Sequence, residues 1–427
     1  MERYRRRIMD EILAKKLQAK GAVLIEGPKW CGKTTTAAEA AATQLMLAKP
    51  NIRESFRHLL EIDSDEALAG ETPVLIDEWQ TVPKLWDAVR YTVDQRQRFG
   101  QFILTGSAVP DAKAEKEINH SGTGRFAWLK MRPMSLFESG ESNGRVSLGA
   151  LFASPERVLE KNDLRLQDIA FLICRGGWPV SVGLPEETAL EQAFDYYDAV
   201  TKEDIVRVDG IKRSSERAQR LMRAYARHQG TQASIETLRK DLKNNDSEDL
   251  DDKTVVSYLD ALRKIFVIED MAAWNPNLRS GTAIRTSDTR YFIDPSIAAA
   301  ALRLGPADLL NDLNTMGFLF ETLCVRDLRV FAEALGGHVF HYRDKLGLEC
   351  DAVVHLRSGQ YGLIEIKLGG QSLIEEGAKS LRKLADRIDT TKMKTPSFKM
   401  VLTAVGEYAY RRPEDDVYVV PIGCLRS

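Results

Sequence analysis

The stretch Gly27-Pro28-Lys29-Trp30-Cys31-Gly32-Lys33-Thr34 decides the fold of the first part of this 427-residue chain. It fits the pattern G-x-x-x-x-G-K-[ST]. It also follows an apolar run at 22–25 and precedes an alanine-rich stretch at 35–42 that favours a helix. Strand, glycine loop and helix in this order predict a phosphate-binding loop, in which backbone amides and the positive end of the helix dipole face phosphate groups. The alternative is a glycine turn that ends in Gly-Lys-Thr by chance.

This loop predicts ATP and Mg²⁺ as cofactors. Lys33 is expected to reach the β- and γ-phosphates, and the Thr34 hydroxyl to ligate Mg²⁺. The expected nucleotide contacts also include residues from two later strands. The full set is Gly27, Pro28, Lys29, Trp30, Cys31, Gly32, Lys33, Thr34, Thr35, Asp77 and Thr105.

A second apolar segment, Pro73-Val74-Leu75-Ile76, runs directly into Asp77 and Glu78. Central parallel strands carry such groups to the carboxyl edge of their sheet, where the phosphate loop also lies. Asp77 is therefore expected to hold Mg²⁺, and Glu78 to polarise the attacking water. A buried strand followed by a solvated acidic turn is the alternative.

Residues 102–107 predict a further strand that ends in hydroxyl groups. Thr105 or Ser107 could sense the γ-phosphate or orient the water. Arg125, after the glycine turn at 122–124, is a candidate arginine finger, acting in its own chain or in a neighbouring subunit of a homo-oligomer. An ordinary surface arginine is at least as compatible with the pattern.

Composition limits the other functions. The chain has 60 basic and 62 acidic residues, so any contact with nucleic acid has to come from a local patch. Its five cysteines show no metal-like spacing, which favours reduced thiols and a cytoplasmic protein. No apolar stretch is long enough for a signal sequence or a membrane span, and no membrane partner is expected.

The middle of the chain predicts a winged helix. Helices are expected at 218–227, 235–242 and 253–264, and strands at 265–273 and 289–293. The third helix has apolar residues at 255, 258, 259 and 262, which share one face. Such a unit can place its third helix in a DNA major groove. A lid on the ATPase or a subunit contact is the alternative, and the acidic run at 249–252 favours it.

The last third predicts a cluster of acidic side chains on a sheet. Strands are expected at 338–342, 348–356 and 361–368, the last two joined by a turn at 357–360. Because strand side chains alternate, Glu365 and Lys367 share a face, and the adjacent strand can bring Asp351 beside them. Two carboxylates and a lysine suit metal-dependent hydrolysis of phosphodiesters. Glu321, from the preceding helix, completes the predicted metal ligands with Asp351 and Glu365.

A helix at 372–387 and a strand at 398–402 extend this segment to the order α-β-β-β-α-β. That order predicts a restriction-endonuclease-like core. The fold class is therefore α/β: a P-loop parallel sheet, a helical and winged-helix region, and a restriction-endonuclease-like α/β domain. The predicted domains are 1–150, 151–305 and 306–427.

Taken together, these motifs resemble a group of prokaryotic AAA+-like P-loop ATPases whose C-terminal part is a domain of unknown function. The resemblance rests on 27–34, 75–80, 104–107, 124–125, 132–136, 176–179, 292–295, 320–321, 349–351 and 365–367. It implies binding of ATP and Mg²⁺, a middle winged helix and a nuclease-like last domain. Cys350 stands where the common nuclease pattern has a proline.

Two functions follow as hypotheses. In the first, the protein hydrolyses ATP, acts on DNA and carries a metal-dependent nuclease-like domain. Lys33, Glu78 and Arg125 would then serve ATP turnover, and Glu365 and Lys367 the cleavage of phosphodiesters. In the second, ATP sets the conformation of a switch that binds DNA or a protein, and the nuclease-like domain is inactive. A protein remodeller is less favoured, because the sequence has no aromatic pore loop.

Overall fold

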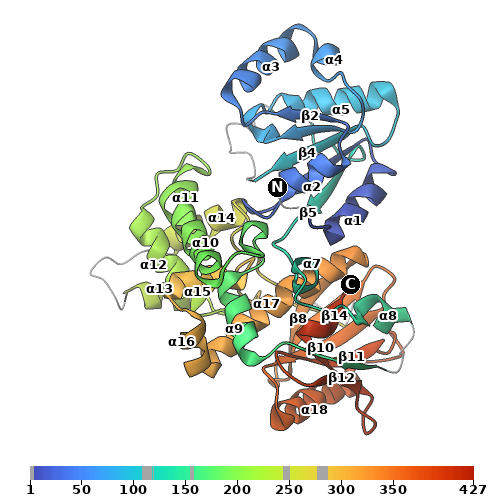
Figure 1. Cartoon of the computed structure of the whole chain (residues 1–427), viewed down its shortest axis with the longest axis vertical. Helices are drawn as coiled ribbons and strands as arrows, with labels where there is room; N and C mark the ends of the chain where they lie inside the picture. Colours follow the sequence, from blue (N-terminus) through green and yellow to red (C-terminus); the bar gives the residue numbers. More distant parts are fainter. Residues whose placement is uncertain (1–3, 108–117, 119, 154–157, 244–250, 277–286) are drawn as a thin grey trace. The chain divides into compact units, whose positions relative to one another are not determined.

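The computed structural model describes residues 4–107, 118, 120–153, 158–243, 251–276 and 287–427 (Figure 1). The chain packs into two compact units, each built from separate stretches of sequence. Unit 1 comprises Met1–Pro133, Lys202–Ser215 and Asp260–Val267; unit 2 comprises Met134–Thr201, Glu216–Leu259 and Ile268–Ser427. The division at 1–150, 151–305 and 306–427 stays a prediction, because these units group the segments differently.

Unit 1 contains a parallel sheet of five strands in the order β2-β3-β4-β1-β5. The strands are β1 (Ala22–Glu26), β2 (Thr43–Met46), β3 (Val74–Asp77), β4 (Phe102–Gly106) and β5 (Phe126–Lys130). Strand β4 lies between β1 and β3, and its Thr105 is opposite both Ile25 and Asp77. This register brings the ends of the three predicted site strands together at one edge.

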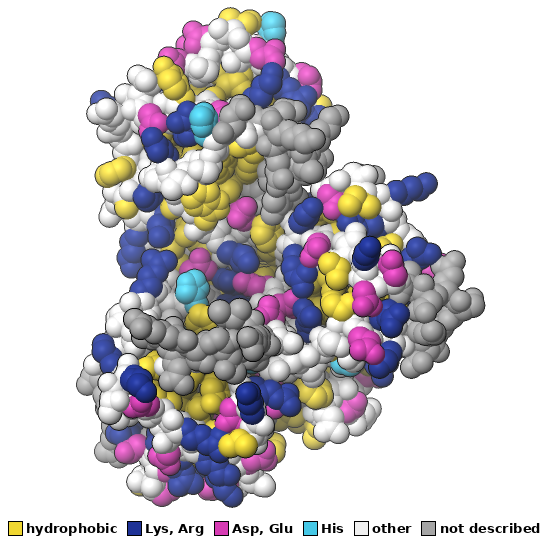
Figure 2. All heavy atoms as spheres, turned by 180° about the vertical axis from the view of Figure 1, so that it is seen from behind, with side chains coloured by type: hydrophobic (Ala, Val, Ile, Leu, Met, Phe, Trp, Pro, Cys, Tyr) yellow, Lys and Arg dark blue, Asp and Glu magenta, His cyan; other side chains and the backbone are white. Residues whose placement is uncertain are grey.

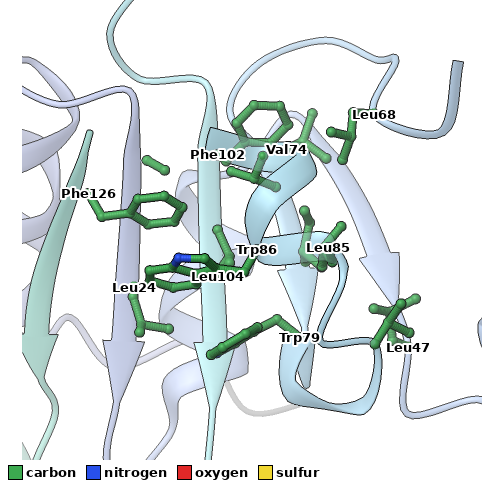
Figure 3. Packing of buried hydrophobic residues seen from close by; sticks show 14 of the residues in the cluster. Leu24, Leu47, Leu68, Val74, Trp79, Leu85, Trp86, Phe102, Leu104 and Phe126 are labelled. Atoms are coloured by element: carbon green, nitrogen blue, oxygen red, sulfur yellow. The ribbon is translucent and has the colours of Figure 1, made fainter. Parts of the chain in front are cut away.

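Helices cover both faces of this sheet, because its central strands are apolar on both sides. Those of unit 1 include α1 (Ile8–Leu17), α2 (Lys33–Ala40), α3 (Pro50–Ile62), α4 (Ser64–Ala67), α5 (Leu85–Arg96) and α11 (Ile205–Arg207). On one face, Trp79 and Trp86 lie over the sheet near Leu104 (Figure 3). The Trp86 ring stacks on Phe126, with centroids 4.0 Å apart. On the other face, Leu13 of α1 packs in a second buried cluster.

Unit 2 contains a mixed sheet of seven strands in the order β7-β12-β13-β11-β10-β9-β8. Its strands are β7 (Leu159–Lys161), β8 (Gly337–Arg343), β9 (Glu349–Leu356), β10 (Tyr361–Lys367), β11 (Phe398–Thr403), β12 (Tyr408–Arg411) and β13 (Val417–Pro421). Helix α17 (Leu313–Ala334) precedes β8, and α18 (Gln371–Arg387) connects β10 to β11. The element order predicted for the last third is therefore present. Its likeness to restriction endonucleases remains a prediction.

The helical part of the chain contains the three expected helices, α12 (Ser215–Ala226), α13 (Ile235–Lys243) and α14 (Asp252–Lys264). It also contains α9 (Leu166–Arg175), α10 (Glu186–Ala199), α15 (Pro295–Leu302) and α16 (Pro306–Asn311), which were not predicted individually. Helices α12 to α14 occupy the three positions predicted for a winged helix, with α14 ending in unit 1.

The two predicted wing strands are shorter than expected. In place of strands at 265–273 and 289–293, only the isolated antiparallel bridges Ile268–Phe292 and Met271–Thr289 form within the described residues. Two features limit the pairing. Phe266 has a left-handed φ of 59°, and Ala273 pairs with β8 instead. Residues 277–286 lie outside the described part of the chain. The winged helix itself remains a prediction.

A buried ion network connects four segments of unit 2. The guanidinium of Arg326 on α17 is 1% exposed and lies 2.9 Å from Asp294 and 2.7 Å from Asp327. Asp294 also accepts a hydrogen bond from the backbone amide of Gly177, and Asp327 accepts one from that of Leu136. The network thus connects the backbone at Leu136 and Gly177 with Asp294 and α17.

Replacing Arg326 by Leu should lower the free energy of unfolding by about 3–5 kcal/mol, because it leaves two buried carboxylates without their cation. Urea denaturation measures this loss. Arg343→Leu is the control, since the ion pair of Arg343 with Glu349 is half-exposed and should contribute less than about 1 kcal/mol. Equal losses in both variants would contradict the structural role of the network.

Candidate functional site

The loop between β1 and α2 has backbone torsions that favour glycine. Gly27 and Gly32 have φ of 155° and 100°, and Trp30 has a left-handed φ of 67°. A Cβ atom on Gly27 would lie 2.1 Å from the carbonyl oxygen of Met131, so no larger residue fits there. Gly32 directly precedes the first turn of α2. The loop thus wraps around the positive end of the helix, as anion binding requires.

The Lys33 side chain lies folded over this loop. Its Nζ donates hydrogen bonds to the carbonyl oxygens of Gly27 at 3.0 Å and Pro28 at 2.7 Å, and the residue is buried. Within the described residues, these two neutral oxygens are its partners. A buried ammonium without a carboxylate favours an anionic ligand. The loop therefore fits a nucleotide phosphate.

Helix α2 and strands β3 and β4 bring their site residues to one carboxylate oxygen. Thr34 Oγ1 donates to Asp77 Oδ1 at 2.7 Å, and Thr105 Oγ1 donates to the same oxygen at 2.6 Å. Asp77 is 4% exposed, so this contact is largely shielded from water. A hydroxyl and a carboxylate are oxygen ligands of the kind that Mg²⁺ takes while keeping several waters. Thr34 and Asp77 thus fit the predicted magnesium ligands.

Glu78 is held by two neighbours at the same edge. The Ser107 hydroxyl lies 3.2 and 3.3 Å from its two carboxylate oxygens, and Gln80 Nε2 donates to Oε2. The backbone of Glu78 has a left-handed φ of 56°, which is uncommon for a residue with a side chain and is found at functional sites. Sequence reasoning placed Ser107 near the site but gave Gln80 no role.

Arg125 lies at the opposite edge of the sheet. It precedes β5, which runs parallel to β1, so it stands beside the start of β1 rather than beside the loop that follows it. A five-residue strand spans about 16 Å. The guanidinium bonds instead to Asp94, at 2.8 and 3.2 Å. The candidate finger within the same chain is therefore wrong, and a finger for a neighbouring subunit stays a prediction.

The segment before β1 braces the phosphate loop. Buried Arg7 donates from its two terminal nitrogens to the carbonyl oxygens of Cys31 at 2.8 Å and Arg132 at 2.9 Å. Tyr4 hydrogen-bonds with Thr36 on α2 at 2.9 Å. The sequence shows a basic run here, but nothing in it indicates that one arginine folds back onto the loop.

Other predicted loop contacts differ in exposure. Cys31 is fully buried, and the Trp30 side chain is 48% exposed. Lys29 is ion-paired with Asp204 in the 202–215 segment of unit 1. Thr35 lies in the first turn of α2. These placements keep Lys29 and Trp30 at the surface of the loop, where a ligand can reach them.

The acidic residues of the last third form a cluster in unit 2. Lys367 Nζ lies 2.8 Å from Glu365 Oε2 and 3.5 Å from Asp351 Oδ2. Asp351 Oδ2 also accepts a hydrogen bond of 2.7 Å from the backbone amide of Ile366, across the β9–β10 hairpin. Glu321 approaches from α17. The four predicted residues therefore come together.

Burial controls the charges in this cluster. It raises the pKa of Glu321 and of Glu365 to about 8, with the neighbouring Asp351 charge acting in the same direction. For Lys367, burial opposes the charged form, but the Asp351 and Glu365 carboxylates outweigh it and raise the pKa. Near neutral pH the lysine is the fixed charge of the cluster.

The predicted three-ligand metal site is not formed in the described residues. No group of three His, Cys, Asp or Glu side chains there has a geometry that could hold a metal ion. The ammonium of Lys367 already lies between Glu365 and Asp351 and satisfies both. Glu321, Asp351 and Glu365 thus share a cluster without surrounding a common point.

Two residues of this cluster were not predicted. The Tyr291 hydroxyl donates a hydrogen bond to Glu321, and Gly230 leaves room for that carboxylate. A Cβ atom on Gly230 would lie 2.9 Å from Glu321 Oε1. Both residues come from the helical part of unit 2, far from Glu321 in sequence, so no local pattern could have indicated them.

Three family matches cover most of the chain. Residues 19–139 match the family described as AAA domain. The chain begins with a P-loop domain of the AAA type. Residues 166–308 and 316–425 match two families described as domains of unknown function, DUF8612 and DUF4143. Neither description gives a winged helix or a nuclease.

Individual relatives are distant. The uncharacterized proteins Mb2031c of Mycobacterium bovis and Rv2008c of Mycobacterium tuberculosis are each 23% identical over 359 residues, which cover 83% of this chain and 72% of theirs. The Walker-type ATPase PABY2304 of Pyrococcus abyssi is 12% identical with a TM-score of 0.40, over 68% of this chain and 94% of that one. Cdc6p of Pyrobaculum aerophilum is 13% identical with a TM-score of 0.22, over 74% of this chain and 93% of that one.

No helix in the described residues is long and apolar enough to cross a membrane.

Replacing Tyr291 by Phe should lower the free energy of unfolding by about 1–3 kcal/mol, because buried Glu321 loses a hydrogen-bond donor. Urea denaturation checks the loss. Tyr408→Phe, at an exposed position on β12, is the control and should change the stability by less than about 0.5 kcal/mol. A variant as stable as the parent would show that the hydroxyl does not support Glu321.

Proposed function

We propose that this protein binds ATP with Mg²⁺ and hydrolyses it at the β1–α2 loop. The observation that carries the proposal is the meeting of Thr34, Asp77 and Thr105 at one carboxylate oxygen, beside a loop that holds a buried lysine. The match of residues 19–139 to the AAA domain family supports the same conclusion. ATP is the expected nucleotide, and Mg²⁺ neutralises charge on its phosphates when bound.

Each site residue then has one task. Lys33 exchanges its two loop carbonyls for phosphate oxygens, which offer a charged partner in place of neutral ones. Thr34 and Asp77 hold the metal ion. Glu78 accepts a proton from water, and the hydrogen bonds from Ser107 and Gln80 fix the orientation of its carboxylate.

Binding and chemistry should separate in two variants. Lys33→Ala should abolish binding of a fluorescent ATP analogue, because the ligand loses its charged partner. Glu78→Gln should keep that binding and lower the hydrolysis rate by about 10²–10⁴-fold, as expected for loss of a general base. Fluorescence titration and phosphate release measure the two effects.

Lys345→Ala, at an exposed position of unit 2, is the matched control and should leave both readouts unchanged. Hydrolysis at the parental rate in Lys33→Ala would show that the loop is not the site of ATP hydrolysis. If Arg125 serves as an arginine finger, it does so in a neighbouring subunit, and that role requires a homo-oligomer.

For unit 2 we propose contact with DNA through the acid cluster, with hydrolysis of phosphodiesters as its chemistry. Glu365, Lys367 and Asp351 lie on adjacent strands, and the lysine can offset charge on a phosphate. The carboxylates of Glu321, Asp351 and Glu365 would have to rearrange to hold a metal ion.

The alternative is an ATP-regulated switch that binds DNA or a protein through an inactive nuclease-like part. The lysine that already satisfies Glu365 and Asp351 favours this alternative. So does the distribution of charge, because acidic and basic side chains are interspersed on the face shown in Figure 2. The near-neutral net charge of −2 agrees with it.

Cleavage of plasmid and single-stranded DNA, with Mg²⁺ or Mn²⁺ and with or without ATP, decides between the two. A nuclease should lose cleavage in Glu365→Ala, which removes a predicted metal ligand, and keep it in the exposed control Glu376→Ala. If cleavage requires ATP, the nuclease activity of unit 2 depends on the nucleotide site in unit 1. No cleavage by the parent protein under any condition would contradict the nuclease and favour the switch.

A further inference from the structure

A cavity of about 750 Å³ lies in the helical part of unit 2, apart from both proposed sites. Its wall comes from α12, α13 and the segments around α15, α16 and the start of α17. No member of the acid cluster lines it. Pockets for small organic ligands have volumes of about 300–1,000 Å³, so the cavity has a suitable size.

One wall of the cavity carries two arginines of α12 and a third that directly follows the helix. Arg220, Arg223 and Arg227 are spaced by three and four residues, which places them on one face of the helix. Arg220 pairs with Glu216 at 2.5 Å, and Arg227 pairs with Asp241 at 3.4 Å.

Arg223 differs from its two neighbours. It is exposed, and no carboxylate of the described residues lies within 4 Å of it. Within the described part of the chain, its guanidinium therefore lacks the carboxylate partner that Arg220 and Arg227 each have. A bound anion would supply that opposite charge and accept charge-assisted hydrogen bonds.

The rest of the cavity is partly apolar. Phe318, on the first turns of α17, is 46% exposed, although large aromatic side chains usually gain by burial. Leu302 and Leu304 also line the cavity. Asp308 and Asp312 also line the cavity, so an anionic group is repelled there and favoured at α12. The cavity is therefore complementary to a ligand with an anionic end and an apolar body.

We propose that this cavity binds a small organic anion, a phosphate, carboxylate or sulfonate attached to an aromatic body. The anionic group lies at Arg223 and is flanked by Arg220 and Arg227. The aromatic body packs on Phe318 and the adjacent leucines. This site requires neither ATP hydrolysis nor DNA cleavage, so it stands or fails independently of both.

The test uses 8-anilinonaphthalene-1-sulfonate, a fluorescent aryl sulfonate with this chemistry. The full chain is titrated in the Lys33→Ala background, so that the phosphate loop contributes less to binding. Arg223→Glu should weaken the affinity by about tenfold or more, which corresponds to the loss of one charge-assisted contact. Phe318→Ser should weaken it by about fivefold, because the apolar contact is lost.

Two matched controls lie outside the cavity. Arg357→Glu changes an exposed arginine in the β9–β10 turn, and Phe99→Ser changes a phenylalanine of unit 1 that is 68% exposed. Both should retain the parental affinity within about twofold. All four changed positions are exposed, and circular dichroism confirms that each variant is folded.

Competition identifies the source of the anion. Displacement of the dye by AMP but not by phenyl phosphate would indicate a nucleotide, and displacement by both would indicate a general aryl phosphate site. Equal affinities for Arg223→Glu and Arg357→Glu would overturn the proposal. A loss of dye affinity in Phe99→Ser as large as the loss in Phe318→Ser would also overturn it.

Discussion

The burial of one guanidinium constrains the rest of unit 2. The guanidinium of Arg326 is almost fully buried, so its positive charge has to be balanced by carboxylates. Asp294 and Asp327 provide them. Those same carboxylates accept backbone hydrogen bonds from segments about 117 and 191 residues away in sequence. The resulting network fixes the position of α17. Because Glu321 lies on the same helix, the acid cluster depends on this network for its geometry.

In unit 1 the corresponding constraint is strand order. Inserting β4 between β1 and β3 puts Thr105 opposite Asp77 and next to the end of β1. A single carboxylate oxygen then accepts hydrogen bonds from two hydroxyl groups, those of Thr34 and Thr105. Hydrogen bonds of this kind restrict the side chains of a site to few conformations, which reduces the entropic cost of binding.

The sequence predicted those features that a local pattern encodes. The strands before Gly27, Asp77 and Glu365 were found because apolar runs end at polar groups, and the parallel sheet follows from them. The assignment of Arg125 as a finger within its own chain considered the residue type but not the direction of β5, which places Arg125 at the other end of the strand from the loop. The hydrogen bond from Tyr291 to Glu321 could not be predicted, because it joins residues that are 30 positions apart and lie in different elements. The length of the wing strands was overestimated. Strand propensity depends on the local residues and cannot show that Ala273 pairs with β8 of another sheet.

The interleaving of the two units has a consequence for biosynthesis. Unit 1 includes Asp260–Val267, so its last segment leaves the ribosome only after most of the helical part of the chain has been made. Chains usually fold domain by domain as they emerge, the N-terminal domain first. All five strands of the P-loop sheet are made by Lys130, but the last segment of unit 1 is made more than a hundred residues later. Because this segment includes buried Leu262 and Val267, the apolar surface that it packs against stays exposed on the nascent chain for longer than it would in a contiguous domain.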